Sequence, residues 1–344
     1  MAPLVSILIP AYNSQQWIAD SIESALAQTW PKKEIVVVDD GSSDSTLEIA
    51  RRFSSRAVRV ISQANQGAAA ARNTAFAASQ GDYIQWLDAD DLLDPRKIEM
   101  QVRALDNCAS QRTLVSGAWA YFSYRQQKAR FAATPLWSDL TPLEWLVRKM
   151  GQNLQMQTDN WLVSRELSDA AGPWDTRLWR DNDGEYFSRV ILASDGIKFV
   201  ADAKSYYRRA GFTSISYIGG SNKKLESLYL SMTLHMRYLR SMEDSQRTRL
   251  ACLYYIQTWL PEFYALRPDI VDELRRITTE LGGSLEEPQL PWKYHWIARS
   301  VGWSPARRLQ LLVPKLRWSM AIAWDRAMFQ VENRSRRAAE PANS

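Results

Sequence analysis

The chain has 344 residues, 46% of them hydrophobic and 24% charged, which is the balance of a globular protein with room for a large core and a second domain or appendage. Its apolar runs fall short of the roughly 20 residues that cross a bilayer, and its first residues enter a strand pattern without the basic start of a secretory signal. Cys108 and Cys252 provide neither a disulfide framework nor the spacing of metal ligands. The expected compartment is therefore the reducing cytoplasm.

The net charge of +5 is concentrated at the C-terminal end. From Leu290 onward the chain has ten lysines and arginines against three acidic residues, so the first 289 residues carry a net charge of about −2 (5 − 7). An enzyme that acts on nucleic acid would line its working face with basic residues. The distribution therefore argues against a nucleic-acid partner.

Strand and helix patterns alternate through the N-terminal part. Short apolar runs predict buried strands at 4–10, 34–38, 58–61 and 83–87. Helical spacing predicts helices at 17–26, 45–53, 68–79 and 92–105. Ser45 and Glu48 have the spacing of a capping box, and Gly81 is placed to end the third helix.

This order predicts an α/β fold with a mainly parallel sheet, helices on both faces, and strand-end loops that converge at one edge. Such an edge suits a nucleotide. Neither the G-x-G-x-x-G nor the G-x-x-x-x-G-K-[ST] pattern is present, which disfavours a dinucleotide site and a P-loop.

The stretch from Gly81 to Asp94, G-D-Y-I-Q-W-L-D-A-D-D-L-L-D, joins a short strand pattern directly to three aspartates. Asp88, Asp90 and Asp91 would repel one another at a strand end unless a cation is bound. Mg²⁺ and Mn²⁺ take oxygen ligands, typically one or two carboxylates together with substrate phosphates. The alternative is an acidic turn that caps the next helix.

Four segments, in this order, resemble those of the family 2 glycosyltransferases: V-S-I-L-I-P-A-Y-N, V-V-V-D-D-G-S-S-D-S-T, N-Q-G-A-A-A-A-R-N and L-D-A-D-D. The resemblance covers about the first hundred residues closely and continues loosely to about Ser216. It implies the GT-A fold, a doubly wound mixed sheet, for a catalytic domain at 1–216. Within it, a nucleotide-sugar half would span about 1–110 and an acceptor half about 111–216.

The resemblance also implies a donor site for a nucleotide-diphosphate sugar, with a UDP-sugar as first choice. Its matching positions are Pro10, Tyr12, Asp39, Asp40, Gly67, Arg72, Asp88 and Arg208. Tyr12 would stack on the nucleobase, and Asp40, with Asp39 beside it, would accept a hydrogen bond from the base. Arg72 would pair with phosphate oxygens, as a guanidinium does well, and Arg208 would approach the diphosphate.

For the metal, the resemblance assigns Mn²⁺ or Mg²⁺ to Asp90, with Asp91 close by and Asp88 facing the ribose or a metal-bound water. The cation would take up negative charge as the nucleoside diphosphate leaves.

The catalytic base is expected near the segment L-W-R-D-N-D-G-E-Y-F at 178–187, which stands where the family has a Glu-Asp signature. The alignment puts Asp183 on the family's Asp and Asn182 on its Glu. One carboxylate must take the proton from the acceptor hydroxyl during in-line attack. We assign this role to Asp183, with Asp181 as runner-up; the alternative is a solvated acidic helix start.

Residues 217–333 read as a helical C-terminal region, and 334–344 as a disordered tail. Beyond Pro305, an amphipathic pattern mixes apolar residues with arginines and lysines, which suits peripheral contact with an anionic membrane. Docking of this helix on its own domain or on a second subunit is the competing interpretation.

The sequence therefore predicts an inverting, metal-dependent glycosyltransferase that moves a sugar to a hydroxyl of a glycan or lipid-linked acceptor, such as a growing polysaccharide. The alternative is a catalytically weakened nucleotide-sugar-binding or scaffold protein, because Asn182 replaces an acid.

Overall fold

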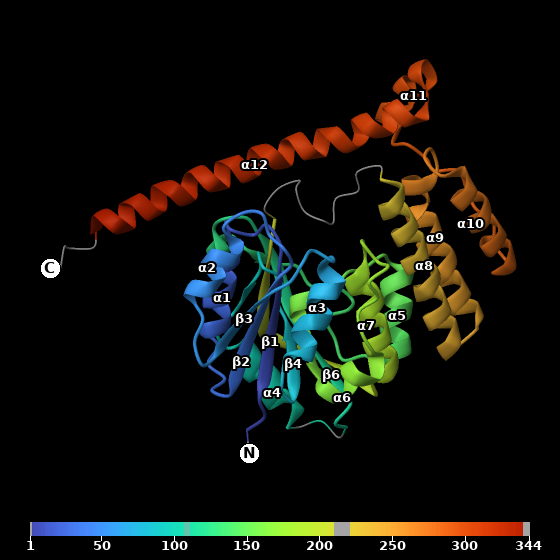
Figure 1. The fold of residues 1–344 in the computed structure, drawn as a ribbon. Coiled ribbons are helices and arrows are strands. Elements are labelled where there is room, and N and C mark those ends of the chain that lie inside the picture. The colour runs from blue at the N-terminus through green and yellow to red at the C-terminus, as the bar shows by residue number, and fades with distance from the viewer. Residues whose placement is uncertain (1, 107, 109, 210–220, 340–344) are drawn as a thin grey trace.

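A nine-stranded mixed sheet forms the centre of the part of the chain that the structure, a computed structural model, describes: residues 2–106, 108, 110–209 and 221–339 (Figure 1). The strand order is β3-β2-β1-β4-β8-β6-β9-β5, with β7 paired to β6. The strands are β1 (Val5–Ala11), β2 (Lys33–Asp39), β3 (Val58–Ser62), β4 (Tyr83–Trp86), β5 (Leu92–Leu93), β6 (Thr113–Phe122), β7 (Arg130–Phe131), β8 (Leu162–Ser164) and β9 (Gly196–Arg208).

The N-terminal half of the sheet is parallel, as predicted. Val5 of β1 is in register with Lys33 of β2 on one side and with Tyr83 of β4 on the other. Because these strands are covered on both faces, they are apolar almost throughout. Helix α3 (Ala68–Ala77) packs on one face, while α1 (Ile18–Leu26), α2 (Thr46–Arg52) and α4 (Lys97–Leu105) contribute to the core on the other.

The second half of the sheet makes it mixed. β8 runs antiparallel to both β4 and β6, and β6 pairs in parallel with β9 across a register shift at Gly117. The carboxyl ends of β1, β2, β4, β6 and β9 therefore meet at one edge. An additional Cβ on Gly117 would lie 2.0 Å from the carbonyl oxygen of Ala203, which explains why this close strand crossing needs glycine.

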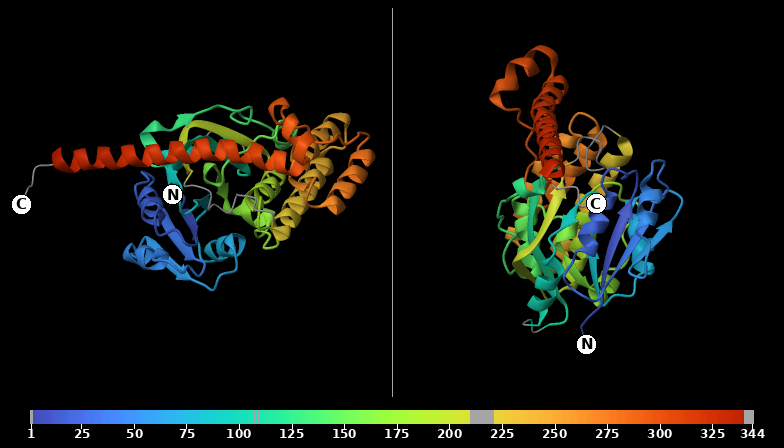
Figure 2. Two further views of the ribbon diagram at one scale, coloured as in Figure 1. Left: turned by 90° about the horizontal axis from the view of Figure 1, so that it is seen from above. Right: turned by 90° about the vertical axis from the view of Figure 1, so that its left-hand side faces the viewer.

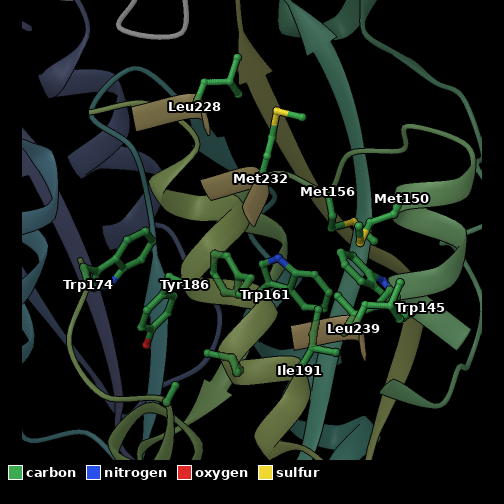
Figure 3. Close-up of a cluster of buried hydrophobic side chains, with 14 of the residues drawn as sticks. Trp145, Met150, Met156, Trp161, Trp174, Tyr186, Ile191, Leu228, Met232 and Leu239 are labelled. Carbon is green, nitrogen blue, oxygen red and sulfur yellow. The ribbon is translucent and has the colours of Figure 1, made fainter. Parts of the chain in front are cut away.

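An aromatic cluster beside this half is built from α5 (Pro142–Gly151), α6 (Arg165–Ala171), α7 (Asn182–Ala193) and their loops. Figure 3 shows side chains of α5, α7 and the loops converging with side chains of α8 (Asn222–Met242). Trp174 stacks on Tyr186 at 4.1 Å between ring centroids, and Trp86 of β4 meets both rings edge-on. The cluster thereby fixes the loop before α7 against the end of β4.

Three local predictions were wrong. Ser45 precedes α2 but accepts no capping hydrogen bond; instead, Asp44 accepts from Thr46. Gly81 is not a helix-ending glycine, and its role is close approach: a Cβ there would lie 2.4 Å from Ser6 Oγ. The predicted helix at 92–105 begins only at Lys97, because Leu92–Leu93 pairs with β9 as β5.

The C-terminal region is helical, as predicted. It consists of α8 (Asn222–Met242), α9 (Gln246–Phe263), α10 (Pro268–Glu280), the short η3 (Trp292–Tyr294), α11 (His295–Val301) and α12 (Trp303–Ala339). Buried residues of α8, α9 and α10 join the same hydrophobic core as the second half of the sheet. α12 continues past position 334, where the sequence analysis began the tail, and residues 340–344 lie outside the described residues.

Helix α12 lies across the edge of the sheet at which the strands end, with α11 at its start (Figures 1 and 2). Within the described residues, no helix has the length and apolar character needed to cross a membrane. The remaining short helices are η1 (Gln126–Lys128) and η2 (Thr158–Asn160).

Candidate active site

The candidate site lies at the carboxyl edge of the sheet, where the loops after β1, β2 and β4 come together. The first two loops are joined by side chains: the Asn13 amide oxygen accepts from the backbone N–H of Ser43, and Ser42 Oγ accepts from the N–H of Asn13. Pro10 is buried at the end of β1, and Tyr12 is 46% exposed, so its ring is accessible for stacking.

Asp39 and Asp40, at the end of β2, are both buried, but they differ in the number of hydrogen bonds that their carboxylate oxygens accept from the protein. Asp40 Oδ1 accepts from Gln63 and from the Gln66 N–H, and Asp40 Oδ2 accepts from the Gly67 N–H. Gly67 has a φ of 91°, a conformation that glycine adopts readily, and it opens α3. Asp39, in contrast, has one buried oxygen, Oδ1, without a hydrogen-bond partner. A buried carboxylate oxygen without a partner is costly unless a ligand donor reaches it.

Arg72 of α3 links the two halves of the site. Its Nη2 donates to Asp88 at 2.7 Å, its Nη1 donates to the Asn182 amide oxygen at 3.2 Å, and its guanidinium lies 4.4 Å above the Trp174 ring. The Arg72 Nε is buried and has no hydrogen-bond partner within the described ranges, so the guanidinium keeps one unused donor there. Asn182, the departure from the family signature, thus occupies a position that faces a cation.

Asp90 and Asp91, like Asp39 and Asp40, differ in the hydrogen bonds that the protein donates to their carboxylates. Asp91 is buried and accepts from the Arg208 backbone N–H at 2.6 Å. Among the described residues, no other side chain forms a hydrogen bond or ion pair with the Asp90 carboxylate. Burial and the charge of Asp88 raise the pKa of Asp90 to about 6. Burial and the neighbouring carboxylates raise the pKa of Asp91 well above its ordinary value.

The guanidinium of Arg208, at the end of β9, is enclosed by the protein. It donates to the Asp90 carbonyl oxygen at 2.7 Å and to Asp20 at 2.8 Å, and it lies between the rings of Trp17 and Phe122. The structure therefore places Arg208 under the acidic loop, which it ties to β9.

The acidic loop after β4 offers few protein ligands for a divalent cation. The described residues contain no cluster of three or more histidine, cysteine or acidic ligands that could enclose a metal. Asp90, a half-buried carboxylate of raised pKa, and the neighbouring Asp88 offer one or two oxygen ligands. This set fits Mg²⁺ or Mn²⁺ bound jointly with ligand phosphates, and it does not fit a metal enclosed by protein alone.

A polar cluster that the sequence analysis missed lies beneath this loop. Lys97 is completely buried, and its Nζ donates to the amide oxygens of Gln85 and Gln101. Asp159 of η2 is also completely buried, and in the part of the chain that the structure describes neither of its carboxylate oxygens accepts a hydrogen bond. Burial lowers the pKa of Lys97 to about 7 and raises the pKa of Asp159 to about 7. Asp159 is the one acid in segment 156–164, which mixes polar and apolar residues, so the sequence carried no distinct signal for this cluster.

The acidic start of α7 supplies the last part of the site. Among the described residues, no other side chain bonds to the Asp183 carboxylate, whose pKa is raised by burial and by the charge of Asp181. The charges of Arg72 and Asp88 also act on this pKa, which places Asp183 at the edge where the donor-side residues meet. Asp181 instead accepts from Ser231 of α8 at 2.9 Å, and Glu185 pairs with Arg189 and Tyr238.

The structure thus brings Asp88, Asp90, Asp183 and Arg72 to one place and turns Asp181 toward α8. The resemblance was expected to continue loosely to about Ser216, and residues 210–216 of that stretch lie outside the described residues.

Residues 6–169 match the domain described as Glycosyl transferase family 2. The chain is 47% identical over 100 residues to chondroitin synthase of Escherichia coli, and 30% identical over 167 residues to an uncharacterized glycosyltransferase of Haemophilus influenzae. The matched segments are 28% and 48% of this chain. They span only 15% of the chondroitin synthase and 63% of the H. influenzae protein.

Among solved structures, residues 1–349 of S. aureus TarS superpose with a TM-score of 0.63 at 17% identity, covering 81% of this chain and 80% of that one. The same protein in complex with UDP-GlcNAc superposes with a TM-score of 0.58 at 17% identity, covering 81% and 92%. At this level of identity the likeness concerns the fold, and it confirms the predicted GT-A architecture with its C-terminal helices. The match of residues 6–169 confirms the predicted resemblance for this part of the chain, which carries a domain similar to glycosyl transferase family 2 on a fold shared with TarS.

Proposed function

We propose that this chain transfers a sugar from a UDP-sugar to a hydroxyl of a glycan or lipid-linked acceptor, with inversion at the anomeric carbon. The observation that carries the proposal is that the charge of Asp88, which pairs with Arg72, acts on both Asp90 and Asp183, two carboxylates without side-chain partners among the described residues. Chondroitin synthase among the relatives, and TarS complexes with UDP and UDP-GlcNAc among similar folds, support a UDP-sugar and a glycan.

The nucleobase would stack on Tyr12, and its N–H would reach the unsatisfied oxygen of Asp39. Asp40 is the less suitable acceptor, because the Gln63–Gly67 loop already donates to both of its oxygens. The diphosphate would lie near Arg72, whose free Nε–H can bind a phosphate oxygen. Arg208 would act indirectly, by holding the acidic loop in place.

Asp90 and Asp88 would hold Mn²⁺ or Mg²⁺, which when bound neutralises charge on the leaving nucleoside diphosphate. Asp183 would act as the base. The acceptor oxygen forms its bond to the anomeric carbon as the bond from that carbon to the diphosphate oxygen breaks, and the acceptor's proton passes to the Asp183 carboxylate. The raised pKa of Asp183 makes it a better proton acceptor than an ordinary aspartate.

A panel of nucleotide sugars tests the proposal. The melting temperature of the protein should rise with UDP and with one UDP-sugar when Mn²⁺ is present, and UDP should be released over time once an acceptor glycan is supplied. Binding of the UDP-sugar without release of UDP, across a range of glycan and lipid-linked acceptors, would favour the scaffold alternative that Asn182 suggests. Absence of any thermal shift with UDP would contradict both functions.

A further inference from the structure

Helix α12 turns its two acidic residues and two aromatic rings inward, and it turns a continuous apolar stripe outward. Its inner face meets the catalytic part through Trp318, Asp325 and Phe329, which recur at the spacing of one helix side. On the opposite side lie Leu309, Leu312, Val313, Leu316, Met320 and Trp324, which we call the outer face of α12. All six are exposed, and Leu316, Met320 and Trp324 are 65%, 73% and 67% exposed.

Specific contacts hold the helix in this orientation. Asp325 accepts from the backbone N–H of Tyr124 at 2.9 Å and from Arg125 Nε at 2.7 Å, and Glu332 accepts from Arg125 Nη1 at 2.9 Å. The Arg209 guanidinium lies between the rings of Tyr121 and Trp318. Rotating α12 to bury its outer face would break both ion pairs of Arg125 and carry Asp325 and Glu332 away from it.

The charge of α12 is strongly one-sided. Residues 303–339 contain eight lysines and arginines against two acids, and those two acids are Asp325 and Glu332, which pair with Arg125. On a helical projection, Arg317 and Arg326 flank the outer face on opposite sides, and Arg317 is exposed. The outer face is therefore an apolar stripe between cationic borders.

We infer that α12 lies flat on an anionic lipid bilayer through its outer face, which sets the carboxyl edge of the sheet toward the membrane. An amphipathic helix with arginines at its borders and tryptophan on its apolar side binds at the interface of a bilayer, and each cation near an anionic surface adds to the affinity. At 37 residues, α12 would cover about 55 Å of that surface. Figure 1 shows α12 at the end of the molecule where the strands of the sheet end, and its contacts with Tyr124, Arg125 and Arg209 place it beside the ends of β6 and β9. The candidate site and the membrane face therefore share one end of the molecule.

A second element at the same end carries exposed tryptophans. Trp292 and Trp296, in η3 and α11, are 84% and 68% exposed, and Figure 1 shows α11 beside the start of α12. Large amphipathic rings of this kind suit the headgroup level of a membrane. A second copy of the chain fits the surface less well, because two symmetric outer faces would bring like-charged borders together without an acidic partner.

Vesicle flotation of the full chain tests the inference, which does not depend on the proposed glycosyl transfer. The protein should float with vesicles of phosphatidylglycerol and phosphatidylcholine, and at least about tenfold less of it should float with pure phosphatidylcholine. Salt at 0.5 M, about the ionic strength at which surface charges are well screened, should weaken the binding. The double variant Leu316→Glu/Met320→Glu should lose at least about tenfold in binding to the anionic vesicles.

The matched control is Leu250→Glu/Tyr254→Glu, which changes two residues one turn apart on α9 that are 57% and 50% exposed. It should bind vesicles as the unchanged chain does. As a second probe that keeps the apolar stripe, Arg317→Glu should weaken binding about fivefold, and Arg56→Glu, in an exposed turn, should not.

Circular dichroism of each variant checks that it is folded. The inference fails if the unchanged chain ignores anionic vesicles, or if the α9 control loses binding as much as the α12 variant. It also fails if the chain is a dimer in solution that Leu316→Glu/Met320→Glu converts to monomers, which would assign the outer face to a second copy.

Discussion

Two acidic groups face each other across the candidate site, and each leaves one carboxylate without a side-chain partner among the described residues. In the loop after β4, Asp88 pairs with Arg72 and Asp91 accepts from the backbone of β9, which leaves Asp90. At the start of α7, Asp181 accepts from Ser231 and Glu185 pairs with Arg189, which leaves Asp183. In both places the neighbouring acids are held by contacts within the protein, and these contacts position the remaining carboxylate.

The two groups differ in what raises the pKa of the remaining carboxylate. Next to burial, Asp90 is affected most by Asp88 and by the opposing charge of Arg208, whereas Asp183 is affected most by Asp181 and Arg72. Each of the two carboxylates therefore adjoins a second acid and is opposed by one arginine, so their surroundings are alike in kind. The proposed division, with charge neutralisation by Asp90 and proton transfer by Asp183, rests on the place of Asp90 in the acidic run and of Asp183 in the family signature.

The largest expected effect separates these two roles. Asp183→Asn should reduce UDP release by about 10²- to 10⁴-fold, because the base is lost, while the thermal shift with UDP and Mn²⁺ is retained. Asp90→Asn should abolish both release and the metal-dependent shift. Steady-state UDP release and thermal melting measure these quantities, and Asp202→Asn, at an exposed aspartate in β9, is the control that should change neither. Equal loss of UDP affinity in both variants would refute the division of roles.

The buried cluster under the first group predicts a large effect on stability. Lys97→Met removes the one cation of that cluster and leaves Asp159 buried without compensation, so the free energy of unfolding should fall by roughly 3–5 kcal/mol. Lys97→Met/Asp159→Leu should recover part of that loss, because no unpaired charge remains. Urea unfolding measures both, and Lys128→Met, at an exposed lysine, should stay within about 0.5 kcal/mol. A Lys97→Met chain as stable as the unchanged one would contradict this account.

The fold was predictable where the signal was local. The runs around β1, β2 and β4 are apolar on both faces, so they identified buried parallel strands without knowledge of the partners. The pair Leu92–Leu93 was assigned to a helix because its strand character comes only from pairing with Tyr206 and Ser205, more than a hundred residues away.

In the candidate site, too, some residues could be found from the sequence and others could not. Asp90 was visible as part of a tight acidic run, and Asp183 through the position of a family signature. The cluster of Lys97 and Asp159 could not be found, because neither residue is unusual in its own segment and their burial is produced by tertiary packing. The donor groups of Arg208 were likewise expected at the diphosphate, since a sequence does not reveal that Asp20 and the Asp90 carbonyl oxygen already accept from them.

The second acidic group also predicts a pH dependence. Asp183 must be ionised to accept a proton, and burial raises its pKa, so kcat/KM should fall as the pH drops through a value above the ordinary aspartate pKa of about 3.9. Above that value activity is fully present as far as this group is concerned. A pH profile of UDP release between pH 4 and pH 8, about the range in which a raised carboxyl pKa titrates, measures the acid limb. A limb at the ordinary aspartate position would indicate that Asp183 is not the base.

The smallest expected effect concerns the runner-up. Asp181 has a φ of 55°, a left-handed conformation that asparagine tolerates, and an asparagine oxygen can still accept from Ser231. Asp181→Asn should therefore change stability by about 1 kcal/mol or less and UDP release by less than about tenfold. Urea unfolding and steady-state UDP release measure the two values, with Asp183→Asn assayed alongside. If Asp181→Asn instead lost as much activity as Asp183→Asn, the proton would pass to the carboxylate that faces α8, and the contact with Ser231 would be part of the catalytic machinery.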